Sequence, residues 1–327
     1  MATALKIGSR PSQLALAQAA IVRERLIAVM PGLQTEIVEI RTSGDRMTSA
    51  SLASVGGKGL FIKELEQALA EHRVDLAVHS MKDLPAELAP EYRIAAVPER
   101  ADARDAIVSR DGLALEKLPP GARVGTSSIR RQFQALKVNP HIAISPLRGN
   151  VDTRLKRVTD GELDAVIIAI AGIRRLWRGA DVKRGADIKV VELDERDFIP
   201  AGGQGALAVE TLAGAAPGRS GDLERALAAI DDPIAHCETA AERAFLATIG
   251  ASCLTPVGVR ATQVDNLLTI RAILFSADGL RELNESVEEP LAAPLDTELA
   301  RAAASRAGER LGQRMLARGA RALIGDE

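Results

Sequence analysis

The chain has 327 residues, which is too long for one small core and favours two or three domains. Apolar residues make up 46% and charged residues 26%, as in ordinary globular proteins, and the net charge of −2 argues against a general polyanion binder. Aromatic residues contribute only 2%, so the stacking platforms that single-stranded nucleic acids require are scarce. We therefore expect no nucleic-acid partner.

Targeting and metal-binding signals are also scarce. Residues 1–20 contain no uninterrupted apolar stretch before a small-residue cleavage site, and the longest apolar run, 165–173, is too short to cross a membrane. The two cysteines, without a C-x-x-C pair, make no disulfide framework, and the four histidines have no ligand spacing. We expect a cytoplasmic protein with no membrane partner and no metal.

The first half of the chain alternates strands and helices. Strands are predicted at 5–8, 36–40, 74–78 and 94–97, and helices at 13–29 and 60–70. A polar segment at 98–102 then precedes a second round, with strands predicted at 105–108, 123–125, 142–147, 165–170 and 190–193. This alternation predicts parallel sheets with helices on their faces.

The pattern of predicted elements changes from residue 222 onwards. A helix-rich segment extends to residue 249, followed by predicted strands at 257–262, 267–274 and 282–287 and a long amphipathic helix at 295–317. This pattern indicates an α+β module with antiparallel pairing. The expected fold class is therefore α/β, with two doubly wound lobes and a smaller α+β C-terminal domain that contains an antiparallel sheet.

The stretch 74–85 combines a buried strand with a polar loop. Its apolar residues alternate up to residue 78, and the loop that follows contains Lys82 and Asp83 before Pro85. In an open α/β sheet, ligands bind outside the carboxyl ends of the strands. An acid beside a base at such a place is a candidate proton-transfer pair, although Lys-Asp in a loop is commonly only a solvated pair.

Hydroxyls and arginines follow several other predicted strands, just where helices begin. They are Arg10, Ser12, Thr126, Ser127, Ser128, Arg130, Arg131, Arg148 and Arg154. Arginine near a helix N-terminus costs a few tenths of a kcal/mol, roughly, so its repetition indicates bound anions. Residues 123–184 hold 13 Lys or Arg against 5 Asp or Glu, which gives a local charge of +8.

The arginine fork binds carboxylate or phosphate with parallel hydrogen bonds, so these residues predict a ligand with several such groups. Four further basic residues are better explained as solvated helix faces: Lys156, Arg157, Arg174 and Arg178.

Two glycine-rich loops and the cysteines remain. The loop 56–59 resembles a phosphate cradle but lacks the P-loop spacing, and 202–205 is most simply a domain-crossing turn. Cys237 lies in a predicted helix as a small core residue. Cys253 lies in a loop of small residues, where a covalent attachment point, a nucleophile that needs a histidine base and an inert thiol all remain open.

Several motifs together resemble the porphobilinogen deaminase (hydroxymethylbilane synthase) family. They are His-Ser-Met-Lys-Asp-Leu-Pro at 79–85, Val-Gly-Gly-Lys-Gly-Leu-Phe at 55–61, Val-Gly-Thr-Ser-Ser-Ile-Arg-Arg at 124–131 and Leu-Arg-Gly-Asn-Val at 147–151. Residues 8–15 and 200–206 also fit, so the resemblance covers nearly the whole chain. The chain departs from many relatives at residues 54, 202 and 251–252, but these changes remove no catalytic group.

The resemblance implies three domains, with boundaries at 1–99 plus 200–220, 104–197 and 222–327. The first two are expected to be like the lobes of periplasmic binding proteins, with the active site in the cleft between them. The third is expected to carry a covalent dipyrromethane cofactor through a thioether to Cys253. The implied reaction joins four porphobilinogens head to tail with loss of ammonia, and water then releases linear 1-hydroxymethylbilane. The resemblance also implies a monomer that works in haem biosynthesis.

The resemblance assigns roles to the residues already singled out. Asp83 is the expected catalytic carboxylate, which stabilises the cation left by ammonia and handles pyrrole N–H protons. Each pyrrole carries an acetate and a propionate, and the arginines and hydroxyls named above are expected to bind these carboxylates. Lys58 and Lys82 are expected to help, and Phe61, Arg175 and Gln204 to line the cleft.

Two other classes of protein are alternatives. A two-lobed carboxylate-binding protein without catalysis would leave Asp83 and Cys253 without a role. A phosphate-handling enzyme such as a nucleotidyl transferase is disfavoured because a P-loop and an obvious acidic metal pair are missing from the sequence. Detection of a bound pyrrole would distinguish a porphobilinogen deaminase from both of these alternatives.

Overall fold

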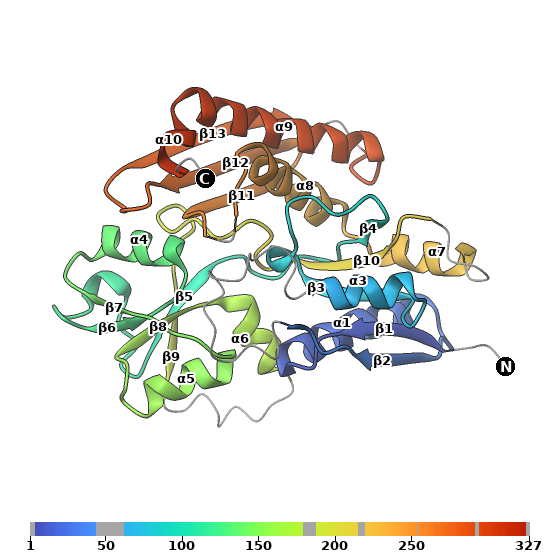
Figure 1. The fold of residues 1–327 in the computed structure, drawn as a ribbon, viewed down its shortest axis with the longest axis horizontal. Helices are drawn as coiled ribbons and strands as arrows, with labels where there is room; N and C mark the ends of the chain where they lie inside the picture. Colours follow the sequence, from blue (N-terminus) through green and yellow to red (C-terminus); the bar gives the residue numbers. More distant parts are fainter. Residues whose placement is uncertain are drawn as a thin grey trace.

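The computed structural model describes residues 4–43, 62–178, 188–214, 220–252, 254–291 and 294–324, and these form three sheets. In Figure 1 the first sheet lies on the right, in blue and teal with one yellow strand, the second lies on the left, mainly in green, and the third lies above both in orange. Lys58, Phe61 and Cys253 lie outside the described residues.

The first sheet has the strand order β2-β1-β3-β10-β4. The strands span Thr35–Glu39 (β2), Leu5–Ser9 (β1), Leu76–Ser80 (β3), Leu207–Leu212 (β10) and Tyr92–Ala96 (β4). Helices α1 (Gln13–Val29), α3 (Lys63–Ala70) and α7 (Ser220–Ile230) belong to this lobe. The α1 helix has the bounds that the sequence predicts, because Ser12 caps its N-terminus.

The second sheet repeats this arrangement with the order β7-β6-β8-β5-β9. The strands span Ala143–Ser145 (β7), Arg123–Gly125 (β6), Ala165–Ala169 (β8), Asp105–Ser109 (β5) and Lys189–Glu192 (β9). Helices α4 (Ile129–Val138), α5 (Val151–Thr159) and α6 (Ile170–Leu176) accompany it.

The prediction of purely parallel sheets is wrong for one strand in each lobe. Strand β10 is antiparallel to both β3 and β4, and β5 is antiparallel to both β8 and β9. Leu207 pairs with Ser80, the last residue of β3, and Asp105 pairs with Ala169, the last residue of β8. Each antiparallel strand therefore starts at the carboxyl edge, because the chain arrives there directly from the other lobe. A short apolar run carries no information about strand direction.

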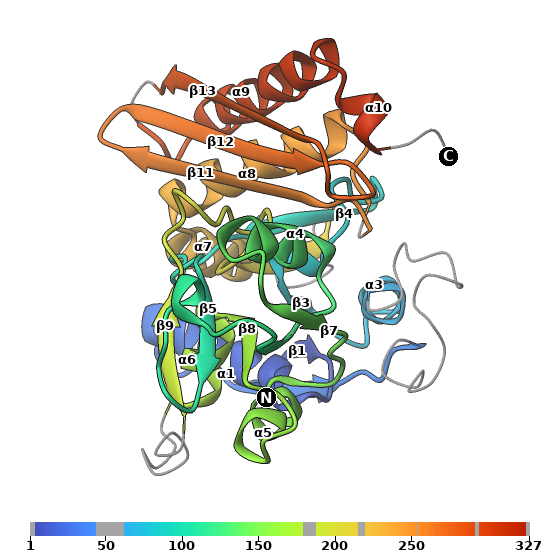
Figure 2. The same cartoon turned by 90° about the vertical axis from the view of Figure 1, so that its left-hand side faces the viewer.

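The third sheet is antiparallel, as predicted, with the order β11-β12-β13. Its strands span Val257–Val264, Leu267–Phe275 and Glu282–Pro290, and the helices are α8 (Pro233–Thr248), α9 (Glu298–Ala317) and α10 (Ala320–Ile324). Figure 2 shows α8 and α9 together on one side of this sheet. A Cβ atom at Gly308 of α9 would lie 2.0 Å from the Ala241 carbonyl oxygen of α8, so glycine permits their close approach.

The fold class predicted from the sequence is thus confirmed. Among the described residues, no helix combines the length and the apolar character that crossing a bilayer requires.

Candidate active site

The site is built on the turn that follows β3. The strand continues through His79 and Ser80, and a 3-10 turn, η2 (Met81–Asp83), follows at once. Met81 and Leu84 are buried on either side, and the Met81 amide donates to the Ala206 carbonyl at 3.1 Å. This anchoring leaves the Lys82 and Asp83 side chains exposed at the carboxyl edge of the sheet, as the sequence predicts.

The segment that returns from the second lobe packs directly against this turn. Gly203 has φ of +73°, and a Cβ atom there would lie 2.6 Å from Met81 Cγ and 3.0 Å from the Lys82 nitrogen. Its amide donates to Glu242 Oε2 at 2.6 Å. Glycine is therefore required both for the left-handed backbone and for the close contact, and the segment fixes the position of the turn.

Gln204 connects the two lobes. Its buried amide nitrogen donates to the Ala103 carbonyl at 2.7 Å and to Asp105 Oδ1 at 2.9 Å. Its oxygen accepts from Lys82 Nζ at 3.3 Å and from Arg131 Nη2 at 3.4 Å. The residue thus brings a lysine of the first lobe and an arginine of the second to the same oxygen atom.

Arg130 and Arg131 are both buried against Asp105. Arg130 donates to Asp105 Oδ2 at 2.8 Å and to the Ile199 carbonyl at 2.7 Å. Arg131 donates to Asp105 Oδ1 through Nη2 at 2.7 Å and through Nε at 3.0 Å, and also to the Ile167 carbonyl at 3.2 Å. Burial alone would raise the pKa of Asp105, but the guanidinium charges and the hydrogen bonds outweigh it and hold that pKa well below its usual range.

The Asp83 carboxylate interacts with charges from both lobes. Burial is the largest cause that lowers the pKa of Arg154, and Arg131 acts in the same direction, whereas Asp83 raises it. Protein packed around Lys82 lowers its pKa to about 8, although part of its side chain remains open to solvent. Arg131 also lowers this pKa, whereas Asp83 opposes the shift. The acid of the first lobe and arginines of the second therefore lie close enough for their charges to interact.

The predicted hydroxyls shape loops of both lobes. Ser12 accepts from the Ala15 amide at 3.2 Å and Ser128 from the Arg131 amide at 3.4 Å, so both cap helices. Thr126 accepts from the Ser128 amide at 3.2 Å. In each of these contacts the hydroxyl oxygen accepts, which leaves its proton available to a ligand. Ser127 differs, because it both accepts from the Leu147 amide at 2.9 Å and donates to the Leu147 carbonyl at 2.8 Å.

The remaining predicted arginines occupy different settings. Arg10 is half-buried directly after β1, and Arg148 is exposed in the turn before α5. Arg154 donates to the Gly149 carbonyl at 2.8 Å. Arg175 of α6 donates to the Gly205 carbonyl at 2.5 Å, and burial lowers its pKa to about 10. The four basic residues predicted to form solvated helix faces are all exposed.

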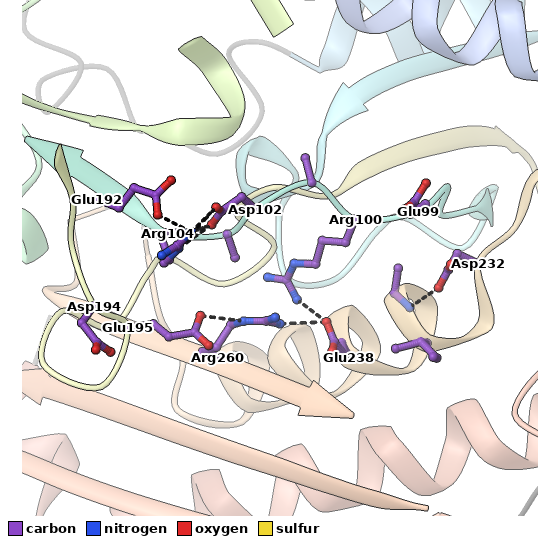
Figure 3. A pocket seen from close by; sticks show the side chains of 14 residues that line it. Glu99, Arg100, Asp102, Arg104, Glu192, Asp194, Glu195, Asp232, Glu238 and Arg260 are labelled. Carbon is purple, nitrogen blue, oxygen red and sulfur yellow. Dashed lines mark hydrogen bonds and ion pairs between the residues drawn. The ribbon is translucent and has the colours of Figure 1, made fainter. Parts of the chain in front are cut away.

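Two cavities among the described residues lie away from this cluster. One, of about 750 Å³, lies between the crossing segment 99–104, α8 and β11. Figure 3 shows Arg100 and Arg260 directed at Glu238 there, at 3.1 and 2.7 Å. The other, of about 550 Å³, lies between the segment 81–87 and helices α8 and α9. Neither includes Asp83, so the candidate site is defined by its side chains. The described residues contain no group of three or more His, Cys, Asp or Glu side chains placed to hold a metal ion.

Asp105 is the site residue that the sequence analysis missed. The sequence pattern identified Asp105 only as the first residue of a predicted strand. A carboxylate that opens an otherwise apolar buried strand is a usable signal, because ionised side chains are rarely buried without a partner. The adjacent arginines at 130 and 131 were available as those partners.

The sequence matches models of known protein families over most of its length. A model of the porphobilinogen deaminase dipyrromethane cofactor binding domain matches residues 5–217, and a model of the porphobilinogen deaminase C-terminal domain matches residues 236–317. The chain belongs to the porphobilinogen deaminase family. The family resemblance predicted from the sequence motifs is therefore confirmed.

Relatives of the same name agree over most of their length. A porphobilinogen deaminase of Thiobacillus denitrificans is 41% identical over 98% of this chain and 97% of its own. One of Chromobacterium violaceum is 45% identical over 87% of this chain and 88% of its own. Among solved structures, a substrate binding domain of a putative amino acid ABC transporter from Streptococcus pneumoniae covers 69% of this chain and 92% of that chain, with 12% identity and a TM-score of 0.41.

Proposed function

We propose that this protein is a transferase of porphyrin and haem biosynthesis that joins four porphobilinogen molecules head to tail and then releases linear 1-hydroxymethylbilane. Family membership supports this activity. The observation that carries the proposal for the site is that Lys82, the neighbour of Asp83 in the first lobe, and Arg131 of the second lobe both donate to Gln204 Oε1, at 3.3 and 3.4 Å. An acid suited to proton transfer and guanidiniums suited to carboxylates therefore face the same space.

Each condensation breaks the bond between the aminomethyl carbon of porphobilinogen and its nitrogen, which leaves as ammonia. A carbon–carbon bond then forms to the free α-carbon of the terminal pyrrole, and that carbon loses a proton. Asp83 is the catalytic carboxylate of the proposal: it stabilises the positive charge that develops as ammonia departs and accepts hydrogen bonds from pyrrole N–H groups. Its exposed position at the end of β3 supports this role.

The substrate and the growing product are polycarboxylates, and the basic residues are proposed to bind them. Lys82 and Arg154 each interact electrostatically with Asp83, and Arg131 interacts electrostatically with both of these basic residues. Arg10 and Arg148 extend the basic lining from the ends of β1 and the loop before α5. Arg130 is almost wholly buried and acts mainly by holding Asp105.

Other proposed contributors complete the lining. The hydroxyls at 12, 126, 127 and 128 and Gln204 come from loops, and Arg175 comes from α6; all of them are proposed to line the same space. Lys58 and Phe61 are proposed from the family resemblance alone.

The dipyrromethane cofactor is proposed to be attached through a thioether to Cys253. Its acetate and propionate groups match the donor set of arginines and capping hydroxyls described above. When bound, it supplies the pyrrole α-position to which the first porphobilinogen is joined. Cys237 is a poor alternative, because its side chain is fully buried and desolvation raises the pKa of its thiol to about 11.

We further propose the three domains with the boundaries predicted from the sequence, a monomeric state and a cytoplasmic location. Membership of the two five-stranded sheets supports the domain boundaries, because β10 at 207–212 joins the first sheet. Size-exclusion chromatography with light scattering tests the monomer: a mass near 34.6 kDa is expected, and a mass of twice this value would contradict it.

Intact-protein mass spectrometry tests the proposed function most directly. Wild-type protein is expected to carry the added mass of two linked pyrrole units and to consume porphobilinogen with release of ammonia. Cys253→Ser is expected to lack the added mass, whereas the control Cys237→Ser keeps it. A bare wild-type polypeptide that stays bare and inactive after incubation with porphobilinogen would contradict the proposal.

A further inference from the structure

Asp105 carries a buried charge whose role the proposed function does not explain. It is the first residue of β5, its side chain is fully buried, and the next three residues of the strand are apolar. A buried carboxylate loses its hydration, so it persists as a charge only where several donors replace the water. The arrangement of these donors indicates what the charge does.

The two oxygens of Asp105 have different partners. Oδ2 accepts from Arg130 at 2.8 Å. Oδ1 accepts from Arg131 at 2.7 Å and from the Gln204 amide nitrogen at 2.9 Å. One carboxylate oxygen thus holds both groups that lie beside Lys82.

The bond from Gln204 to Asp105 fixes the orientation of the amide. The amide nitrogen has two acceptors, Asp105 Oδ1 at 2.9 Å and the Ala103 carbonyl at 2.7 Å. The amide oxygen must therefore point the other way, where it accepts from Lys82 Nζ at 3.3 Å. A flipped amide would present N–H groups to the lysine ammonium, which has no lone pair to accept them.

We infer that Asp105 is a positioning residue that acts through Gln204 and Arg131 to fix the place and the charge of the Lys82 side chain next to the catalytic Asp83. This inference rests on the proposed function only for the role of Asp83. The connection from Asp105 to Lys82 is a property of the polypeptide itself. The buried charge of Asp105 thus contributes to the site. The same hydrogen bonds hold the crossing segment, which contains Ala103, against the returning segment, which contains Gln204.

The charges around Lys82 give the direction of the effect. Desolvation by the protein atoms packed around Lys82 and the charges of Arg131 and Arg130 lower its pKa, whereas Asp83 of its own turn and Asp105 of β5 raise it. Loss of the Asp105 charge removes one of the two negative charges that favour the ammonium form. The pKa of Lys82 in Asp105→Asn is therefore expected to fall below the value of about 8 in the wild type.

Competitive acetylation measures this pKa without relying on turnover. Full-length protein is labelled with trace acetic anhydride from pH 6 to pH 10, and the Lys82 peptide is quantified by mass spectrometry. At pH 7 the Asp105→Asn variant is expected to label Lys82 about three- to tenfold faster than the wild type, because more of the amine is neutral. The matched control is Asp164→Asn, which removes the exposed pair with Arg123 in the same lobe.

Each outcome decides the inference. A shifted Lys82 curve in Asp105→Asn and an unshifted curve in the control support it, together with a lower kcat in protein that keeps its cofactor mass. An unchanged curve in a destabilised variant would show that Asp105 only stabilises the fold, and would overturn the inference. If the wild type carries no cofactor, the proposed function fails, but the Lys82 titration is still measured.

A second variant covers the case in which Asp105→Asn does not fold. Gln204→Met keeps the pairs between Asp105 and both arginines but removes the acceptor of the Lys82 ammonium. Its Lys82 curve is expected to shift to lower pH, because a hydrogen bond to the charged form is lost. A curve that coincides with the wild type would overturn the inference.

Discussion

The two α/β lobes have the same strand order but contribute opposite chemistry. Strand β1 lies between β2 and β3 in the first sheet, as β6 lies between β7 and β8 in the second. The antiparallel strands occupy equivalent places, because β10 separates β3 from β4 and β5 separates β8 from β9. The ends of β1 and β6 also match, since each leads to a serine that caps the next helix. The loop architecture is thus repeated between the lobes.

The difference appears at the ends of β3 and β8. Strand β3 leads into the exposed Lys82 and Asp83, whereas β8 leads into the buried apolar Ile170 and Ala171. The first lobe therefore supplies the carboxylate, and the second supplies guanidiniums from α4 and α5. Repetition of a fold determines where loops lie, but the side chains at each strand end determine what they do.

The antiparallel strands offer a second comparison, because each contains a buried carboxylate. Asp105 pairs in register with the last residue of β8, so it lies at the site edge and has three side-chain donors. Glu210 pairs with Ala77, farther back along β3, and binds His79 at 2.8 Å. Its other oxygen is buried without a hydrogen-bond partner among the described residues. The position of each carboxylate along its strand thus distinguishes Asp105, which lies at the site, from Glu210, which lies in the core.

The largest expected effect comes from the acid that distinguishes the first lobe. Asp83→Asn is expected to lower turnover by about 10²- to 10⁴-fold, because the amide carries no charge and is a poor proton acceptor. The variant should keep its fold and the mass of the attached cofactor, measured by circular dichroism and intact mass. Turnover near the wild-type rate would remove Asp83 from the catalytic role.

Asp105→Asn tests the carboxylate of the second lobe through stability. Loss of this buried partner is expected to reduce the free energy of unfolding by about 3–5 kcal/mol at pH 7. The pKa of Asp105 is depressed in the folded protein, so its stabilisation is present above the ordinary value of 3.8 and is lost as the pH falls toward the folded value.

Urea unfolding from pH 3 to pH 7 measures this dependence. The wild type should lose stability in acid more steeply than Asp105→Asn, because only the wild type has the carboxylate to protonate. The exposed control Asp164→Asn should lose under about 1 kcal/mol at pH 7. Parallel curves for the wild type and Asp105→Asn would contradict the assignment of the buried charge.

The contact between the returning segment and the catalytic turn is tested by two glycines. Gly203→Ala is expected to cost about 2–3 kcal/mol and to reduce turnover about tenfold, because the methyl group displaces Met81 and Lys82. The control Gly32→Ala has a similar backbone, with φ of +88°, but its Cβ would meet nothing within 4 Å.

The control should lose about 1 kcal/mol and no activity. Thermal unfolding and steady-state kinetics separate the two variants. Equal stabilities and rates would show that the contact with the turn is unimportant.

The smallest expected effect concerns a single arginine of the second lobe. Arg154→Gln is expected to raise KM for porphobilinogen about tenfold through loss of one charge-assisted hydrogen bond. Arg157→Gln, on the same helix, removes an exposed arginine paired with Glu162 and should leave KM unchanged. Identical KM values for both variants would place Arg154 outside the substrate site.

The sequence by itself determined the features that depend on neighbours along the chain. The helix at 13–29 follows from a serine cap and a proline-glycine stop, and the exposed acid–base pair follows from an apolar run that ends before a polar turn. The family was identifiable for the same reason, because its motifs are contiguous. Burial of Cys237 in a helix was also predicted correctly.

Only the tertiary structure decided which distant groups meet. Asp105 lies 25 and 26 positions from its arginines and 99 positions from Gln204, so no local pattern links them. The direction of β5 and β10 likewise depends on the edge at which the chain re-enters each sheet. Side-chain periodicity is identical for parallel and antiparallel strands, and burial of a charge is decided by partners that folding brings together.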